Sequence, residues 1–178
     1  MKAKLEGVRN WQEFEALALT VNAKERGDLF ELLTKYYLLL DPKYRTEFSN
    51  VWLLSELPSK VRAELNLPET DQGIDIIAKT KTGGYWAVQC KFRTSDKHSL
   101  TWREISTFNA LAFSVCKGIE FGLIAYTGER YAKVLDKAEH IGFLSGDVWE
   151  TLDEDFFSQL SALLKAEDVL IPRFTPRP

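Results

Sequence analysis

The sequence predicts an α/β domain in which a mixed central β-sheet is flanked by helices. Three observations support this fold class. Apolar residues recur with a helical period near the N-terminus, two short apolar runs joined by a Gly-Gly turn have the pattern of a β-hairpin, and strand-like and helix-like segments alternate after it. The length of 178 residues and the 45% hydrophobic content suffice for one domain with a substantial core.

Periodicity and turn residues predict the order of the elements. Trp11–Val21 and Ala23–Leu40 have helical spacing of apolar residues, and Asn22 between them is a suitable N-cap. The second helix is expected to end at Asp41-Pro42, because a residue before proline disfavours the helical conformation. The remaining elements are expected in this order: a strand at Phe48–Leu54, helical turns at Pro58–Leu65, the hairpin, a helix from a capping box at Thr101 to about Cys116, a strand at Phe121–Tyr126, a helix at Glu129–His140, a strand at Ile141–Leu144 and a helix at Leu152–Leu164.

The hairpin carries polar side chains where a sheet normally packs. Its strands are expected within Gly73–Ala78 and Tyr85–Phe92. Since side chains alternate along a strand, Gln89 and Lys91 share one face, opposite their apolar neighbours. Asp75 lies among isoleucines on the other strand. Because burial of an unpaired charge costs several kcal/mol, we expect a cation and a phosphate between these groups.

These residue types suit metal-assisted hydrolysis of phosphodiesters. Mg²⁺ prefers oxygen ligands and usually takes one or two carboxylates from a protein. Asp75 is a suitable ligand, the backbone carbonyl of Cys90 can add an oxygen, and Glu31 on the second helix can add another carboxylate beside or behind the metal. Lys91 can orient the attacking water or help to deprotonate it.

A family resemblance follows from the same residues. Glu31, Gly73-Ile74-Asp75 and Gln89-Cys90-Lys91-Phe92 resemble the pattern of the PD-(D/E)xK nuclease superfamily, and most closely its Mrr-type branch, in which D-x-G-I-D precedes Q-x-K. The middle element here is Asp71-Gln72-Gly73-Ile74-Asp75. The resemblance covers about residues 24–126 and implies a restriction-endonuclease-like core with the activity of a DNA endonuclease that uses Mg²⁺, or alternatively Mn²⁺.

The resemblance also implies which residues form the site. Glu31, Asp75, Gln89 and Lys91 would be catalytic, and the metal would contact Asp75, Glu31, Gln89 and the Cys90 backbone carbonyl. Two departures stand out: Ile74 rather than a proline precedes Asp75, and Gln89 replaces the usual second acid. The amide removes one negative charge from the metal site, so we expect weak metal affinity.

Each of these residues also has a purely structural interpretation. Glu31 can pair with Lys35 one helical turn away. Asp75 can cap the preceding loop, Gln89 can form a hydrogen bond at a sheet edge, and Lys91 can extend its ammonium group from an edge strand. Q-x-K alone is a common chance match; its position after G-I-D on a hairpin partner, with a helical Glu upstream, makes the pattern specific.

The segment after the second hairpin strand is a candidate DNA contact. From Lys91 to Glu104 it holds four basic residues against two acidic ones, although the whole chain has a net charge of −3. We expect Arg93, Lys97, His98 and Arg103 to contact DNA phosphates, which would make binding depend on salt. A solvated charged loop is the alternative. The overall charge argues against a generally basic surface.

Several other classes are disfavoured. The sequence has no P-loop, so no ATP site of that kind is expected in this chain, and it has neither a G-x-S-x-G elbow nor a glycine-rich dinucleotide turn. We expect Cys90 and Cys116 to be reduced. With no signal peptide and no apolar run of membrane length, a cytoplasmic location is expected.

The C-terminal residues suggest a larger context. Ile171–Pro178 is rich in Pro and Arg and is expected to be neither helix nor central strand. We expect a nuclease domain over residues 1–166 and a linker over residues 167–178. The tail resembles the approach to a superfamily 2 helicase, and the combination is similar to single-polypeptide Type ISP restriction–modification enzymes.

That resemblance implies covalent fusion to helicase-like ATPase and methyltransferase domains, with double-stranded DNA as the partner and no sequence preference in the nuclease itself. Two alternatives stay open. One is a stand-alone Mrr-like nuclease that acts on modified DNA. The other is a degenerate, non-catalytic module for DNA binding or docking.

Overall fold

A computed structural model describes residues 1–69, 73–94, 100–128, 133 and 137–174 of the chain. The elements within these residues are α1 (Lys2–Glu6), α2 (Trp11–Thr20), α3 (Ala23–Leu40), α4 (Pro42–Glu47), β1 (Phe48–Leu53), the 3₁₀ turn η1 (Leu54–Glu56), α5 (Ser59–Glu64), β2 (Ile76–Thr80), β3 (Tyr85–Lys91), α6 (Trp102–Ala110), the π-helical turn η2 (Leu111–Val115), β4 (Ile119–Tyr126), β5 (Ile141–Leu144), α7 (Gly146–Glu150) and α8 (Glu154–Phe174). The predicted helix at Glu129–His140 falls mostly outside the described residues.

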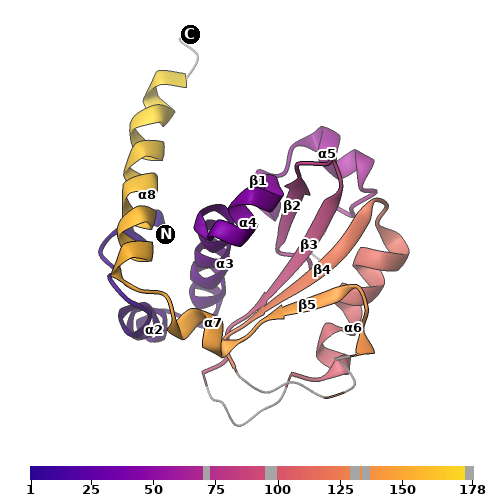
Figure 1. The fold of residues 1–178 in the computed structure, drawn as a ribbon, viewed down its shortest axis with the longest axis horizontal. Helices are drawn as coiled ribbons and strands as arrows, with labels where there is room; N and C mark the ends of the chain where they lie inside the picture. Colours follow the sequence, from indigo (N-terminus) through magenta and orange to yellow (C-terminus); the bar gives the residue numbers. More distant parts are fainter. Residues whose placement is uncertain (70–72, 95–99, 129–132, 134–136, 175–178) are drawn as a thin grey trace.

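The five strands form one mixed sheet in the order β1-β2-β3-β4-β5. The first two pairings are antiparallel, whereas β3 with β4 and β4 with β5 are parallel. Figure 1 shows α3 and α4 on one side of this sheet, α6 on the other, and α8 on the outer side of α3. The prediction of an α/β fold with a mixed, helix-flanked sheet is confirmed.

The N-terminal helices form where their caps predict. Asn10 accepts a hydrogen bond from the Glu13 backbone N–H at the start of α2, and Asn22 accepts one from Glu25 at the start of α3. The α3 helix ends at Leu40 as expected. The next helix, α4, was not predicted: Asp41 caps it with a hydrogen bond from the Lys43 N–H, and Pro42 occupies its first turn.

The predicted hairpin is present and antiparallel, with Ile76 opposite Val88 and Lys79 opposite Tyr85. In its turn the Thr80 hydroxyl accepts a hydrogen bond from the Gly84 N–H at 2.9 Å. The predicted capping box is also confirmed, since Thr101 and Glu104 each accept the other's backbone N–H at the start of α6.

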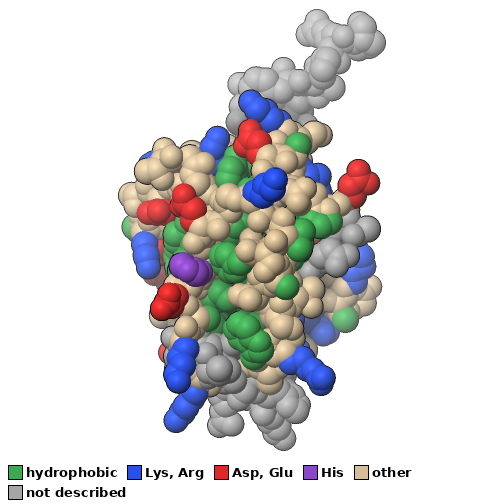
Figure 2. Space-filling view, turned by 90° about the vertical axis from the view of Figure 1, so that its right-hand side faces the viewer, with side chains coloured by type: hydrophobic (Ala, Val, Ile, Leu, Met, Phe, Trp, Pro, Cys, Tyr) green, Lys and Arg blue, Asp and Glu red, His purple; other side chains and the backbone are tan. Residues whose placement is uncertain are grey.

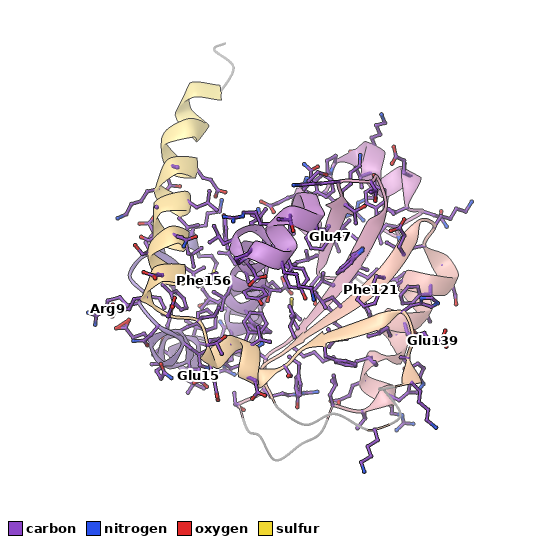
Figure 3. The ribbon with its side chains drawn as sticks, viewed as in Figure 1. Arg9, Glu15, Glu47, Phe121, Glu139 and Phe156 are labelled. Carbon is purple, nitrogen blue, oxygen red and sulfur yellow. The ribbon has the colours of Figure 1, made fainter. Side chains whose placement is uncertain are left out.

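Each face of the sheet covers its own hydrophobic cluster. The α3 side holds most of the aromatic residues, among them Phe30, Tyr36 and Trp149. Phe121 on β4 packs against this cluster, whereas Arg9 and Glu15 lie at the outer surface (Figure 3). The α6 side is smaller and is built around residues such as Phe108 and Ile124. The sheet is therefore enclosed on both sides, and polar groups inside it need partners.

The last helix runs further than predicted. We expected Ile171 onwards to be non-helical because of its prolines, yet α8 continues through Pro172 to Phe174. This expectation was wrong for residues 171–174. A proline inside a helix removes one hydrogen bond and crowds the preceding turn at a cost of about 3 kcal/mol, which a long helix can absorb. No described helix is long and apolar enough to cross a membrane.

The surface on the α6 side and the two cysteines bear on two further expectations. On the α6 side of the molecule, basic, acidic and hydrophobic side chains of the described residues all reach the surface (Figure 2). Cys90 and Cys116 are both free thiols, as predicted.

Candidate active site

Asp75 is held by three backbone contacts just before β2. Its N–H donates to the Val88 carbonyl at 2.9 Å, and its carbonyl accepts the Leu54 N–H at 3.1 Å. Its carboxylate atom Oδ2 accepts the Cys90 N–H at 2.8 Å. Asp75 thus lies where the ladder between β2 and β3 ends, and it is held by β3 on one side and by the first residue of η1 on the other.

Gln89 and Lys91 lie on the face of β3 that the alternation predicted. Their apolar neighbours Val88, Cys90 and Phe92 pack with the α3 cluster, so the Gln89 and Lys91 side chains point to the α6 side. Burial, and then the nearby Arg93, lower the pKa of Lys91, whereas the charges of Glu104 and Asp75 act in the opposite direction. Lys91 therefore lies within electrostatic reach of Asp75.

Gln89 is 7% exposed, and its Oε1 atom has no hydrogen-bond partner in the described part of the chain. Its amide nitrogen lies 3.3 Å from the position that a Cβ on Gly73 would occupy. Gly73 also has a φ of +107°, which side chains rarely adopt. The glycine of the G-I-D element thus leaves room for the Gln89 amide. A buried oxygen without a partner is a ready ligand for a hard cation.

Glu31 reaches the same region from α3. It lines, with Asp75, a pocket of about 650 Å³ whose other charged residues include Lys2, Lys24, Asp28 and Arg62. Burial raises the pKa of the Cys90 thiol; the charge of Asp75 and, less strongly, that of Glu31 act in the same direction, whereas a hydrogen bond with Thr34 lowers it.

The structure brings two of the four predicted residues, Glu31 and Asp75, into one pocket. Gln89 and Lys91 do not line it; they flank Cys90 on β3, whose N–H donates to the Asp75 carboxylate. Lys35, the alternative partner of Glu31, binds both carboxylate oxygens of Glu56 at 2.7 and 3.0 Å.

The donor set fits a divalent cation that prefers oxygen. No group of three His, Cys, Asp or Glu side chains suited to a metal occurs among the described residues. Glu31 and Asp75 nevertheless offer carboxylate oxygens in one pocket, and Gln89 offers an unpartnered amide oxygen, which are ligand types that a hard divalent cation accepts.

A family model for restriction endonucleases, Mrr_cat_2, matches residues 39–142. The chain belongs to this restriction endonuclease family. The match includes Asp75, Gln89 and Lys91 and begins after Glu31. None of the curated proteins compared with the chain matches it.

Two solved structures resemble this restriction endonuclease domain. The ATP-dependent Type ISP restriction–modification enzyme LlaBIII bound to DNA matches with 27% identity and a TM-score of 0.59, over 78% of this chain and 8% of that chain. The MspJI restriction endonuclease in complex with a 27-mer oligonucleotide matches with 15% identity and a TM-score of 0.36, over 90% of this chain and 38% of that chain. The domain thus spans a small part of LlaBIII.

The predicted DNA contacts are only partly described. Lys97 and His98 lie outside the described residues. Arg103 is exposed at the start of α6, whereas Arg93 forms an ion pair with Glu104. The charge of Arg93 is therefore shared with a carboxylate, which reduces its availability to phosphate.

Sequence reasoning did not single out the cations of the pocket. Lys2, Lys24 and Arg62 come from α1, α3 and α5, and no local spacing relates them to Asp75.

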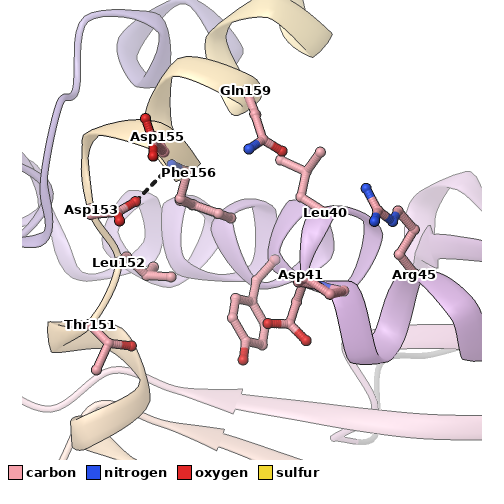
Figure 4. Close-up of a pocket in the computed structure, with 11 residues that line it drawn as sticks. Leu40, Asp41, Arg45, Thr151, Leu152, Asp153, Asp155, Phe156 and Gln159 are labelled. Atoms are coloured by element: carbon pink, nitrogen blue, oxygen red, sulfur yellow. Dashed lines mark hydrogen bonds between the residues drawn. The ribbon is translucent and has the colours of Figure 1, made fainter.

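A second pocket, of about 380 Å³, lies between the start of α4 and the start of α8 (Figure 4). Asp41, Arg45 and Asp155 line it, but none of the four predicted catalytic residues does.

Proposed function

We propose that this restriction endonuclease domain hydrolyses phosphodiester bonds of double-stranded DNA, with Mg²⁺ as its cofactor and without a sequence preference of its own. The observation that supports this most is the position of the Asp75 carboxylate, which accepts a hydrogen bond from the Cys90 N–H and lines the same pocket as Glu31. Its charge also acts on Lys91. Membership of a restriction endonuclease family supports the reaction class.

A bound divalent cation would withdraw electron density from the phosphate and would lower the pKa of the attacking water. Asp75 would be the principal carboxylate ligand, and Glu31 would support the cation or the waters around it. Gln89 Oε1 and the Cys90 carbonyl would be the two neutral oxygen ligands that the protein offers to the cation. Mn²⁺, which accepts the same ligand types, should also serve.

Lys91 would hold the attacking water in line with the scissile bond and offset the negative charge that develops on the phosphate. The half-buried position of its ammonium strengthens such an interaction, since charges act over a lower effective dielectric away from bulk water. Gln89 can add a hydrogen bond from its amide nitrogen to the phosphate or the water.

Supercoiled plasmid tests the proposal directly. We expect nicking or linearisation with Mg²⁺ and with Mn²⁺, none with a chelator, and none by Asp75→Asn. Asp155→Asn, an exposed acid at the second pocket, is the matched control and should cleave like the unaltered chain. Absence of cleavage with either cation at high protein concentration would favour the non-catalytic docking alternative.

We further propose that the domain is the cleavage module of an ATP-driven Type ISP enzyme, fused to helicase-like ATPase and methyltransferase domains. Its similarity to part of LlaBIII supports this. The test is to replace the matching segment of LlaBIII with this chain and to measure ATP-dependent DNA cleavage. Cleavage that needs ATP is the expected result; cleavage of modified DNA alone, independent of ATP, would instead favour a stand-alone Mrr-like nuclease.

A further inference from the structure

Arg62 is a cation in the wall of the pocket that contains Glu31 and Asp75. It lies on α5 and is half-buried. Its Nη1 atom donates to the Pro68 carbonyl at 2.8 Å, and its Nη2 atom donates to the Leu54 carbonyl at 3.4 Å. The guanidinium is therefore held in one orientation by the backbone on two sides.

The same contacts connect Arg62 to Asp75. Leu54 accepts from Arg62 through its carbonyl and donates through its N–H to the Asp75 carbonyl at 3.1 Å. Two hydrogen bonds, both to Leu54, thus connect the Arg62 guanidinium with the backbone of Asp75, the proposed metal ligand. A group bound at Arg62 would have a defined position relative to Asp75.

The charges around the pocket single out Arg62. Acidic side chains such as Asp28, Glu31 and Asp75 would repel a phosphate. Among the cations, Lys24 pairs with Asp28 at 3.4 Å, and Lys2 pairs with Glu167 at 3.2 Å.

Arg62 differs from these lysines. Its hydrogen bonds described above go to neutral carbonyls, and it forms no ion pair with a described carboxylate. A guanidinium has five N–H donors, and these two hydrogen bonds use two of them.

We propose that Arg62 binds a backbone phosphate of the DNA strand whose scissile bond lies at Asp75. This inference rests on the proposed function and adds a DNA contact to it. The pocket volume of about 650 Å³ is in the range that accommodates a nucleotide-sized group. The planar fork of arginine suits phosphate, and its fixed orientation lowers the entropic cost of binding.

The chain contains a matched control. Arg26 on α3 is also half-buried and also bridges two backbone carbonyls, from Nε to Ala18 at 2.9 Å and from Nη2 to Val21 at 3.2 Å. Arg26 does not line the pocket. Substitution of either arginine removes a similar structural bridge, but only Arg62 is placed to meet DNA.

The experiment compares Arg62→Met and Arg26→Met for binding to a fluorescent DNA duplex in Ca²⁺, over a series of salt concentrations. We expect Arg62→Met to weaken binding roughly tenfold and to reduce the slope of log K against log salt by about 0.9, the loss of one phosphate contact. Arg26→Met should leave both unchanged. Arg62→Lys, which keeps the charge, should retain the slope.

Thermal unfolding of all three variants checks that each of them is folded at the temperature of the binding measurement. An unchanged slope for Arg62→Met, or an equal loss of binding by Arg26→Met, would overturn the role of Arg62 while leaving the nuclease proposal in place. If the unaltered chain failed to bind duplex even at low salt, the proposed function would fall together with this inference.

Discussion

The Oδ2 atom of Asp75 accepts a hydrogen bond from the backbone N–H of Cys90 at 2.8 Å. This contact ties the strand that carries Gln89 and Lys91 to the residue proposed to hold the metal. The carboxylate therefore has a structural role as well as a chemical one, and the two can be separated by substitution.

Asp75→Asn should separate them, because the amide oxygen can still accept the Cys90 N–H but brings no charge. We expect cleavage to fall by at least ~10²-fold while the free energy of unfolding stays nearly unchanged. Asp75→Ala should lose cleavage and also about 1–3 kcal/mol of stability, since the Cys90 N–H loses its acceptor. Plasmid cleavage and denaturant unfolding measure the two quantities. Wild-type cleavage by Asp75→Asn would remove Asp75 from the mechanism.

Lys91→Met should abolish cleavage without unfolding the chain. Methionine preserves the apolar stem but removes the ammonium that would offset charge at the phosphate, so we expect a loss of ~10²-fold or more. Because burial disfavours the ammonium, stability in the absence of DNA should not decrease. Single-turnover cleavage and thermal unfolding provide the check, and a variant that cuts as fast as its parent would contradict the role of Lys91.

Gln89→Glu should tighten metal binding by restoring a second acid beside Asp75. A buried carboxylate without a cation is costly, so the variant should be less stable than the parent in a chelator and should gain more stability from added Mg²⁺. We expect a several-fold lower Mg²⁺ concentration at half-maximal stabilisation, measured as the shift of Tm. Equal Mg²⁺ dependence in both proteins would show that Gln89 is not at the cation.

Local signals were sufficient for much of this fold. The Asn22 cap, the helical period of Ala23–Leu40 and the capping box at Thr101 depend on neighbours within one turn, and all are confirmed. The alternation along β3 placed Gln89 and Lys91 on one face in the same way. Patterns of this kind need no knowledge of tertiary contacts.

Features that depend on competing or distant contacts were missed. Asp41-Pro42 reads as a stop signal, but the same pair also supplies an N-cap and a first-turn proline, and α4 begins there. The continuation of α8 past Pro172 opposes local propensity. Arg62 is connected to Asp75 through the backbone of Leu54, and no sequence spacing contains that relationship.

Gly73 offers a test of how closely the site is packed. Gly73→Ala should cost roughly 1–3 kcal/mol for its φ of +107° and should also displace the Gln89 amide, 3.3 Å from the new Cβ. Gly83→Ala is the matched control, with a φ of +99° and nothing within 4 Å of its Cβ. Both variants should lose stability, but only Gly73→Ala should lose cleavage beyond that. Equal losses of cleavage in Gly73→Ala and Gly83→Ala would show that cleavage does not depend on the exact position of the Gln89 amide.

Glu104 should make stability depend on pH in the acid range. Although burial raises its pKa, hydrogen bonds from Thr101 and the charge of Arg93 lower it below the ordinary value of 4.5. A carboxylate with a depressed pKa in the folded state stabilises the fold above its unfolded pKa, and that contribution is lost as pH falls through the folded pKa.

Glu104→Gln retains an oxygen for the Thr101 N–H but cannot titrate. The stability difference between the parent and Glu104→Gln should therefore be present at ~pH 7 and should shrink toward ~pH 3. Thr101→Ala, which removes the cap and leaves the Arg93 pair, should lose about 1 kcal/mol at ~pH 7. Urea unfolding across this range gives both curves. A difference between the parent and Glu104→Gln that stays constant with pH would mean that the Glu104 charge does not stabilise the start of α6.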